Sequence, residues 1–154
     1  MSHLNSFLAA IPGKGANRAV DLWLTVVFSN HVYTERAQHG EAHHVLDHNN
    51  AKRKFNVQRY QMSLTLGERL KAKIAANELT FMSRSFGGID NLILIEMSDG
   101  STWTIVYCLL PEDDGMIRME VLSAHPKIID QRKISRKPLS YFTRQCIFEK
   151  RRVP

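Results

Sequence analysis

Four of the seven histidines in this 154-residue chain lie within the eleven-residue segment QHGEAHHVLDH, residues 38–48. They form two pairs with the i, i+4 spacing that places two imidazoles on one face of a helix: His39 with His43, and His44 with His48. Glu41 and Asp47 could add oxygen ligands for a zinc ion. However, the metalloprotease order His-Glu-x-x-His is absent, and Gly40 weakens the helix that the spacing requires. We therefore expect a polar surface connection without a bound metal; a zinc site and a loop that contacts substrate are the alternatives.

Two histidines outside this segment follow apolar stretches of strand-like composition. His31 comes after VDLWLTVVFSN, and His125 ends MIRMEVLSAH just before Pro126. A sheet positions residues at its strand ends more firmly than a loop does, and imidazole changes its charge near neutral pH. His31 and His125 are therefore candidates for a general base and a general acid. The alternative is that each histidine only caps its strand through a hydrogen bond.

Arginine and aromatic side chains complete the candidate site. Arg59 lies in VQRYQMSL among residues expected to be half-buried, so its guanidinium needs an anionic partner or several carbonyl oxygens. A salt bridge to Glu35, Glu96 or Glu120 would be a purely structural explanation. Arg36 could hold a phosphate in the same way as Arg59. Three aromatic residues could stack on a base: Tyr33, Tyr107 and Trp103.

The positive charge of the chain is concentrated at its C-terminal end. The whole chain carries a formal charge of +6, whereas residues 127–154 contain nine Lys or Arg and two acidic residues and carry +7, which leaves −1 for the first 126 residues. Such asymmetry favours contact with a polyanion, most often nucleic acid, although a solvated segment that keeps the protein soluble is the alternative. The expected contacts to RNA or DNA include Lys127, Arg132, Lys133 and Arg136.

Length and composition indicate one globular domain, residues 1–154. The chain is 44% hydrophobic and 23% charged, which is unlike a disordered protein. Its early apolar stretch, VDLWLTVVF, is about half the length needed to cross a bilayer, and no basic residue precedes the first apolar run as in a secretory signal. Cys108 and Cys146 are too far apart in sequence for a zinc knuckle and are expected to be reduced thiols. We expect a cytoplasmic location without membrane contact.

The candidate residues depend on the elements that position them, beginning with the N-terminal half. The stretch SHLNSFLAAI predicts a short helix that ends at PGKG, residues 12–15. AVDLWLTVVFSN predicts a buried strand, which residues 31–36 continue by alternation. Residues 37–54 are polar and aperiodic, with a turn at Asn49-Asn50. Alternation in KFNVQRYQMSL, residues 54–64, predicts a second strand.

The clearest helix signal is SLTLGERLKAKIAANE, residues 63–78. Its apolar residues recur at spacings of three and four: Leu66, Leu70, Ile74 and Ala75. Thr65 is the expected cap, with Glu68 completing a capping box, and Asn77 is the expected stop. Strands of an antiparallel meander follow: residues 78–86, 90–98, 101–110 and 116–124. Asp99-Gly100 predicts a tight hairpin between the second and third of them.

The C-terminal segment predicts a further helix after Pro138. LSYFTRQCIFEK is amphipathic, with Leu139, Phe142 and Cys146 on one face, and Arg144 is expected elsewhere on its surface. Such a helix could dock on the sheet and still present positive charge. The predicted fold class is α+β: an antiparallel sheet with one main helix packed on it and short helices at the termini.

The stretch STWTIVYCLLPEDDGMIRMEVLSAHPK, residues 101–127, resembles the closing hairpin and last strand of small ribonuclease toxins of the RelE type. The order strand, helix and antiparallel hairpin is also similar to that of barnase-like, EndoU-like and colicin-type nucleases. The resemblance implies a concave sheet face that binds RNA and cleaves it without a metal or other cofactor. It also implies catalytic roles for residues gathered in one concavity: His31, Arg59, Tyr107 and His125. The long connection at 37–54 and the basic tail depart from the toxin pattern.

Metal-free RNA cleavage needs a base for the 2′-OH proton, an acid for the leaving 5′ oxygen and a cation for the charge on phosphorus. His31 and His125 would supply the pair, and Arg59 or Arg36 the cation. A non-enzymatic alternative stays open, because a sheet face with a basic tail is enough to bind nucleic acid or to block another protein, as small phage- or plasmid-borne regulators do. A metal-dependent enzyme is the third alternative. The sequence leaves open which nucleic acid is bound, the oligomeric state and the existence of a cognate protein inhibitor.

Overall fold

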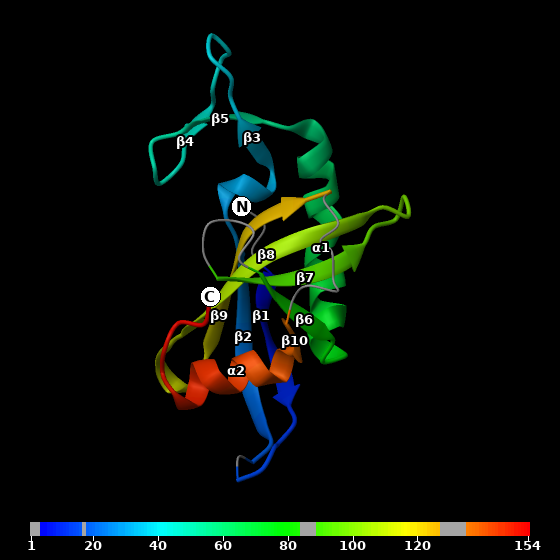
Figure 1. Ribbon diagram of the computed structural model, residues 1–154, viewed down its shortest axis with the longest axis vertical. Helices are drawn as coiled ribbons and strands as arrows, with labels where there is room; N and C mark the ends of the chain where they lie inside the picture. The colour runs from blue at the N-terminus through cyan, green and yellow to red at the C-terminus, as the bar shows by residue number, and fades with distance from the viewer. Residues whose placement is uncertain (1–3, 17, 84–88, 127–134) are drawn as a thin grey trace.

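The computed structural model describes residues 4–16, 18–83, 89–126 and 135–154. Its first two strands, β1 (Leu4–Ile11) and β2 (Val20–Phe28), pair antiparallel as a hairpin (Figure 1). The helix predicted at the N-terminus is therefore wrong for the residues that β1 covers. Pairing with β2 buries Ala9 and Ile11 on one side of the strand, and this two-residue repeat outweighs the weak helical pattern.

A seven-stranded sheet forms the body of the molecule, in the strand order β1-β2-β9-β8-β7-β6-β10. Its central strands confirm the predicted meander: β6 (Leu79–Ser83), β7 (Asp90–Glu96), β8 (Thr102–Pro111) and β9 (Ile117–His125). Gly100, with a φ of 81°, lies in the tight connection from β7 to β8, as predicted. A short 3-10 helix, η2 (Asp113–Gly115), joins β8 to β9. β2 joins β9 in parallel, and β10 (Ser135–Pro138) pairs antiparallel with β6.

The main helix, α1 (Val57–Ala75), begins before the segment from which it was predicted. Asn56 caps it, because its side-chain oxygen accepts the backbone N–H of Arg59 at 2.9 Å. The strand predicted for residues 54–64 is therefore wrong beyond Phe55. The cap predicted at Thr65 is also wrong, since that residue lies in the middle of the helix.

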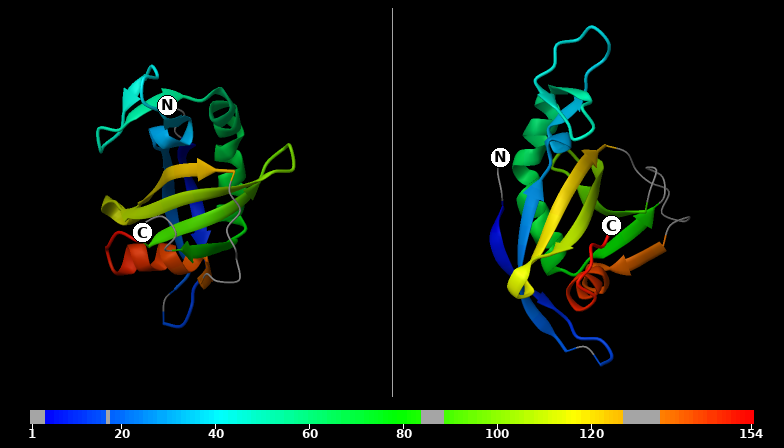
Figure 2. Two further views of the ribbon diagram at one scale, coloured as in Figure 1. Left: turned by 45° about the horizontal axis from the view of Figure 1, so that its top comes forward. Right: turned by 90° about the vertical axis from the view of Figure 1, so that its left-hand side faces the viewer.

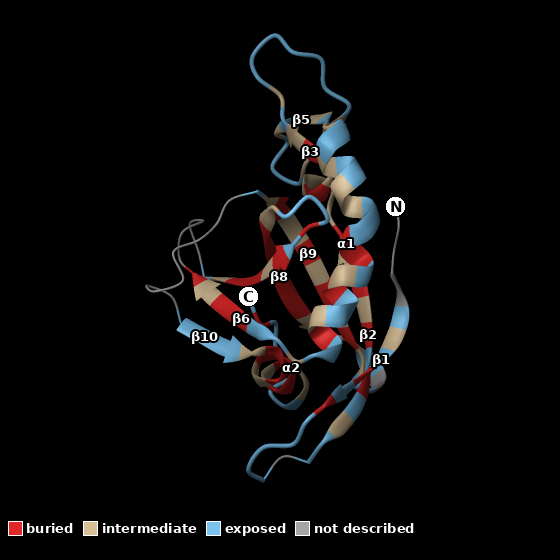
Figure 3. Cartoon of the chain, turned by 90° about the vertical axis from the view of Figure 1, so that its right-hand side faces the viewer, coloured by how far each residue is buried: buried red, intermediate tan, exposed pale blue. Residues whose placement is uncertain are grey.

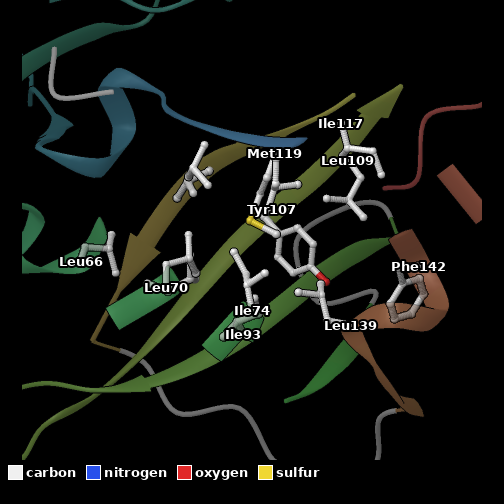
Figure 4. Packing of buried hydrophobic residues seen from close by; sticks show 14 of the residues in the cluster. Leu66, Leu70, Ile74, Ile93, Tyr107, Leu109, Ile117, Met119, Leu139 and Phe142 are labelled. Carbon is white, nitrogen blue, oxygen red and sulfur yellow. The ribbon is translucent and has the colours of Figure 1, made fainter. Parts of the chain in front are cut away.

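One apolar core lies between the sheet and the two helices, α1 and α2 (Leu139–Phe148) (Figure 4). The predicted apolar stripe of α1 is confirmed except at Ala75, which is exposed. The predicted buried face of α2 is confirmed as well. The buried residues of this core come from both helices and from the sheet, and include Leu66, Leu70 and Ile74 of α1, Leu139, Phe142 and Cys146 of α2, and Ile93, Ile105 and Leu109 of the sheet. Each such side chain contributes about 1.5–3 kcal/mol when it leaves water.

The two helices meet where one ends and the other begins. α1 ends before Asn77, as predicted, and the φ of this residue is 49°. The side-chain oxygen of Asn77 accepts the backbone N–H of Ser140 in the first turn of α2, at 2.8 Å. Arg144, which was expected on the surface of α2, is only 8% exposed. The expectation is wrong because the connection after β1 reaches α2, where the carbonyl of Pro12 accepts Nη1 of Arg144 at 2.6 Å.

A second, three-stranded sheet projects from one end of the molecule (Figures 1 and 2). The chain leaves β2 through a short 3-10 helix, η1 (Asn30–Val32), so the predicted continuation of the first strand through residues 31–36 is wrong. The small sheet then contains β3 (Thr34–Arg36), β4 (Val45–Leu46) and β5 (Lys52–Phe55), in the order β3-β5-β4. The predicted turn at Asn49-Asn50 is confirmed between β4 and β5. We call residues 29–60 the tip.

The fold is α+β, as the sequence predicts. Figure 3 shows buried residues concentrated on the main sheet and on one side of each helix, whereas most of the tip is exposed. On the opposite face of the sheet a smaller apolar cluster contains Phe81, Leu92 and Val106. In the parts of the chain that the structure describes, no helix combines the length and the apolar character required to cross a membrane.

Candidate acid–base site at the tip

His31 is attached to the main sheet through its neighbour Ser29. The backbone N–H of Ser29 donates to the carbonyl of Val121 at 2.9 Å, and its hydroxyl donates to the carbonyl of Leu122 at 2.6 Å. The same hydroxyl oxygen accepts the N–H of His31 at 3.2 Å and caps η1. The sheet therefore positions His31, although through a short helix and not through a strand end.

Asp47 orients the imidazole of His31. One carboxylate oxygen, Oδ2, lies 3.1 Å from Nε2 of His31. The other, Oδ1, accepts the backbone N–H groups of Asn49 and Ala51, both at 2.9 Å, so the turn between β4 and β5 fixes the carboxylate. The side chain of Asp47 is 5% exposed and that of His31 is 26% exposed. With Nε2 donating to Asp47, Nδ1 is the nitrogen of His31 that can accept a proton.

Arg53 links this pair to the backbone around it. Its Nη1 lies 3.8 Å from Oδ2 of Asp47, while Nε and Nη2 donate to the hydroxyl and the carbonyl of Thr34 at 2.8 and 3.0 Å. The Thr34 hydroxyl donates to the carbonyl of Asn30 at 2.7 Å. Arg53 is 8% exposed, so its buried charge depends on this carboxylate and these oxygens. Because Asn30 belongs to η1, the network connects β5 to the helix that carries His31.

Arg59 joins the first turn of α1 to the same network. Its Nη1 donates to the carbonyls of His31 and Thr34 at 3.2 and 3.0 Å. The prediction that this half-buried guanidinium needs carbonyl partners is confirmed. Glu35, one of the carboxylates considered for it, forms an ion pair with Lys54 instead, at 3.3 Å. Arg59 therefore positions the backbone of His31.

A second histidine, His48, lies beside His31. The centroids of the two rings are 6.1 Å apart and their planes are inclined by 25°. His48 is exposed, so one imidazole of the pair is fixed by a carboxylate and the other is open to solvent. A group that forms a hydrogen bond of about 3 Å to each ring can bridge them.

The surroundings of His31 and Asp47 favour a neutral imidazole beside an ionised carboxylate. Burial, together with Arg53, lowers the pKa of His31, and Asp47 opposes this shift only in part. Burial alone would raise the pKa of Asp47, but the N–H groups of Ala51 and Asn49 and the contact with His31 outweigh it and lower that pKa. His31 is therefore able to accept a proton at neutral pH, as a general base must.

Arg36 provides a cation next to this pair. It lies opposite Arg53 in the pairing of β3 with β5, so the two side chains share a face of the small sheet. Arg36 is exposed and forms no ion pair with the residues that the structure describes. Tyr33 is half-buried and packs against the main core, which leaves only part of its ring for a ligand.

Comparison with known protein families assigns the chain to one of them. A family model described as the YjaZ family matches residues 1–147, nearly the whole chain. The chain belongs to the YjaZ family. The matched region contains the entire tip and nearly all of α2. Neither a curated protein nor a solved structure matches the chain.

Two of the site residues predicted for this YjaZ-family chain belong to the core. Tyr107 is 0% exposed, and Trp103 is 4% exposed. Burial raises the pKa of the Tyr107 hydroxyl. The nearby Thr80 side chain lowers this pKa in part, although the geometry of the Tyr107 hydroxyl gives it no hydrogen bond among the described residues. Both rings are therefore buried in the core and are not open to a ligand as predicted. Figure 4 shows Tyr107 among the buried residues.

His125 ends β9, as predicted, but does not approach the tip pair. Its neighbour Ala124 faces the helices and lines a small apolar pocket with Arg59, so alternation directs His125 to the opposite face of the sheet. There its Nε2 lies 3.0 Å from the Ser123 hydroxyl. The predicted concavity of His31, Arg59, Tyr107 and His125 is therefore not formed, and only His31 and Arg59 come together.

The basic residues predicted to bind nucleic acid lie far from the tip or outside the described residues. Arg136 is exposed on β10, at the other end of the molecule in Figure 1. The remaining three, Lys127, Arg132 and Lys133, fall outside the described residues.

The histidine-rich segment has two different parts. His39 and His43 are exposed, whereas Nδ1 of His44 accepts the backbone N–H of Phe55 at 3.2 Å. Within the described ranges no group of three or more His, Cys, Asp or Glu side chains could hold a metal ion. That the segment binds no metal stays a prediction. Its last residues, including His48, belong to the candidate site.

Sequence reasoning missed Asp47, His48 and Arg53 as partners of His31. All three lie between residues 37 and 54, which were expected to form only a connection. Asp-His-Asn-Asn is a recognisable signal, because an aspartate at the start of a turn binds the following backbone N–H groups and is thereby fixed. The sequence does not reveal that this turn folds back on a residue 16 positions earlier.

Proposed function

We propose that the chain is a metal-independent ribonuclease with His31 as its general base. The supporting observation is the arrangement of His31, Asp47 and His48, with two imidazoles 6.1 Å apart and a carboxylate oxygen 3.1 Å from one of them. Nδ1 of His31 takes the proton of a ribose 2′-OH, and the 2′ oxygen attacks phosphorus to form a 2′,3′-cyclic phosphate. The bond from phosphorus to the 5′ oxygen breaks, and protonated His48 donates its proton to that oxygen.

The neighbouring charges suit this reaction. Asp47 holds the proton on Nε2 of His31 and stabilises the imidazolium that forms, as the carboxylate of a catalytic triad does. The exposed guanidinium of Arg36 can bind the phosphate as its charge increases. Arg53 and Arg59 hold the network in place. The substrate class is RNA, because the attacking group is the 2′-OH that DNA lacks.

Cleavage of RNA in the presence of a chelator tests the proposal. The purified protein is incubated with total RNA and EDTA, and the products are examined for 2′,3′-cyclic phosphate ends. His31→Ala is expected to lower the rate about 100-fold or more, because a positioned base contributes about 10²–10⁴-fold. His48→Ala is expected to lower it by a similar factor at a pH where the acid limits the reaction.

The matched control is His43→Ala. This histidine is exposed in the same segment and lies outside the His31–Asp47 network, so its removal should leave the rate unchanged. RNA that remains intact with the unmodified protein would refute the proposal. Equal losses in His31→Ala and His43→Ala would refute the roles given to His31 and His48.

A non-enzymatic nucleic-acid-binding role is the second candidate. The observation that favours it is an exposed aromatic pair at the tip, Phe55 and Tyr60, which are 43% and 44% exposed with ring centroids 5.3 Å apart. Exposed rings next to Arg36 can stack on unpaired bases without any chemistry. In that case RNA binds and remains intact, Tyr60→Ala weakens binding, and His31→Ala does not. A regulator of this kind could also act on a protein partner.

A further inference from the structure

α2 and the connection that follows β1 lie at the end of the molecule opposite the tip (Figures 1 and 2). Residues of both line a groove of about 300 Å³. Its lining residues are Lys14, Tyr141, Arg144, Gln145, Phe148 and Glu149. Three of them, Tyr141, Gln145 and Phe148, are spaced by four and three residues and therefore follow one side of α2. The volume is at the lower end of the range for small-molecule sites, about 300–1,000 Å³. None of the lining residues belongs to the tip.

The charge of this groove is positive. Lys14 is exposed at one side of it, and Nζ of Lys137 lies 5.5 Å from the centroid of the Tyr141 ring. The acidic lining residue, Glu149, forms an ion pair with Arg151. The cations therefore outnumber the acidic groups, and an anion is the favoured ligand.

Arg144 is the most firmly held of these cations. It is 8% exposed, and its Nη1 donates to the carbonyl of Pro12 at 2.6 Å. A guanidinium has five N–H donors in a planar fork, so this one bond leaves others for a ligand. Because the side chain is already fixed, little conformational entropy is lost when a phosphate binds to it.

The groove also offers aromatic surface. Tyr141 packs edge-on against buried Phe142, with centroids 5.2 Å apart and planes at 88°, so its ring is held in one orientation. Nε2 of Gln145 lies 3.4 Å from the Tyr141 hydroxyl. Phe148 is 48% exposed at the other end of the same side of α2. Tyr141 is half-buried, so part of its ring is left for a ligand. Accessible rings beside cations are typical of sites that stack unpaired bases and hold their phosphates.

We propose that this groove binds one nucleotide unit of a single-stranded nucleic acid. Arg144 and Lys14 contact the phosphate, and the ring of Tyr141 or Phe148 lies against the base. An acidic peptide would be attracted by the same cations, but it would gain nothing from the flat rings. The proposal does not depend on cleavage at the tip, because the groove contains no residue of that site.

Binding of a fluorescein-labelled deoxyuridine oligonucleotide, followed by anisotropy, tests binding separately from cleavage, since this strand has no 2′-OH and cannot be cleaved by the proposed reaction. Tyr141→Ala is expected to weaken binding at least about fivefold, as loss of one stacked base does. Lys14→Ala is expected to weaken it about threefold at low salt and to reduce the slope of log K against log salt by about 0.7. Lys150→Ala removes an equal charge just outside the groove and should change binding less than twofold.

Several outcomes would overturn the proposal. If Lys150→Ala weakens binding as much as Lys14→Ala, the attraction is diffuse and the groove is not a site. Unchanged binding by both Tyr141→Ala and Phe148→Ala would exclude stacking. Since Tyr141→Ala could disturb α2, Lys14→Ala in an exposed connection provides the independent test. If free UMP binds as tightly as the strand, the groove belongs to a free nucleotide. By contrast, loss of RNA cleavage in His31→Ala with full oligonucleotide binding would support the proposal, because the groove would then bind without the chemistry of the tip.

Discussion

Side chains at the tip are fixed by one another, whereas those of the α2 groove are fixed by the main fold. At the tip, Asp47, Arg53 and Thr34 form a network that holds His31, and most of the residues around them are exposed. In the groove, Arg144 and Tyr141 project from a helix whose other face is buried in the core. The tip therefore carries acid–base groups on a largely exposed surface, and the groove is a pocket whose described lining contains no histidine.

This difference separates chemistry from binding in a testable way. The tip network is polar, so its integrity depends on charge and hydrogen bonds and therefore on pH. The groove rests on apolar packing, which pH changes little. α1 connects the two regions, since it begins in the tip and Asn77, just after its end, accepts the backbone N–H of Ser140 in α2.

Leu70→Ala is expected to affect both regions most strongly. Leu70 is 0% exposed in the core, and removing its side chain should lower the free energy of unfolding by about 2–5 kcal/mol. Urea unfolding measures this loss, and cleavage and oligonucleotide binding should fail together as the protein unfolds. Leu64→Ala on the same helix, at a position that is 61% exposed, is the control and should change stability by less than about 0.5 kcal/mol. A small effect of Leu70→Ala would contradict the packing described for α1.

Asp47→Asn is expected to affect the tip alone. Without the carboxylate, the imidazolium of His31 loses its stabilising charge, and cleavage should fall at least about tenfold. Because Asp47 opposes the lowering of the pKa of His31, its removal should lower that pKa further and shift the acidic limb of the pH–rate profile to lower pH. Oligonucleotide binding in the groove should not change.

Asp99→Asn is the matched control for this substitution. Asp99 also accepts hydrogen bonds within a turn, from the backbone N–H and the hydroxyl of Ser101, but that turn joins β7 to β8. Cleavage should therefore be unaffected. An acidic limb that stays in place in Asp47→Asn would argue against His31 as the base.

Much of the main sheet and its helices could be predicted, because the local sequence pattern and the packing of the folded chain favour the same elements there. The apolar runs of β7 and β8, with Asp99-Gly100 between them, predict the observed hairpin. The alternating pattern of residues 54–64 predicted a strand that is not formed beyond Phe55. Phe55 and Val57 alternate as in a strand, although both are exposed. Asn56 decides the outcome, because its side chain caps the helix that begins at the next residue.

The candidate site could be predicted only in part. His31 and Arg59 were recognisable because polar residues next to apolar segments need partners, and both have them. Tyr107 was predicted as a site residue although it lies in the continuous apolar run TIVYCLL, which is the pattern of a strand buried on both faces. Asp47 required knowledge of how a polar turn folds back, which depends on the β4–β5 hairpin and not on local composition.

Stability is expected to fall as the pH decreases from neutrality, because of His31. The pKa of His31 in the folded state is below its ordinary value of 6.5, so the unfolded chain binds more protons below that pH. The contribution of neutral His31 to the free energy of unfolding is complete above about pH 6.5 and is lost as the pH falls through the folded-state pKa of His31. Urea midpoints measured between about pH 7 and pH 5 should change less in His31→Gln than in the unmodified protein or in His43→Gln. If the urea midpoints of all three proteins changed equally with pH, the lowered pKa of His31 would be contradicted.

Tyr107→Phe is expected to have the smallest effect, and it distinguishes the core from both candidate surfaces. The Tyr107 hydroxyl is buried, and its geometry gives it no hydrogen bond within the described part of the chain. Removing the oxygen therefore breaks no hydrogen bond and relieves the cost of keeping a polar atom from water. The ring still fills the same space between the sheet and the helices (Figure 4). We therefore expect the free energy of unfolding to change by less than about 1 kcal/mol, in either direction, with cleavage and oligonucleotide binding unchanged. Tyr107→Ala is the contrasting variant, because the cavity it leaves should cost about 3–5 kcal/mol, by analogy with other large aromatic residues. If Tyr107→Phe abolished cleavage in a folded protein, the hydroxyl would have to reach the substrate, and the core position of this residue and the tip as the site of chemistry would both have to be abandoned.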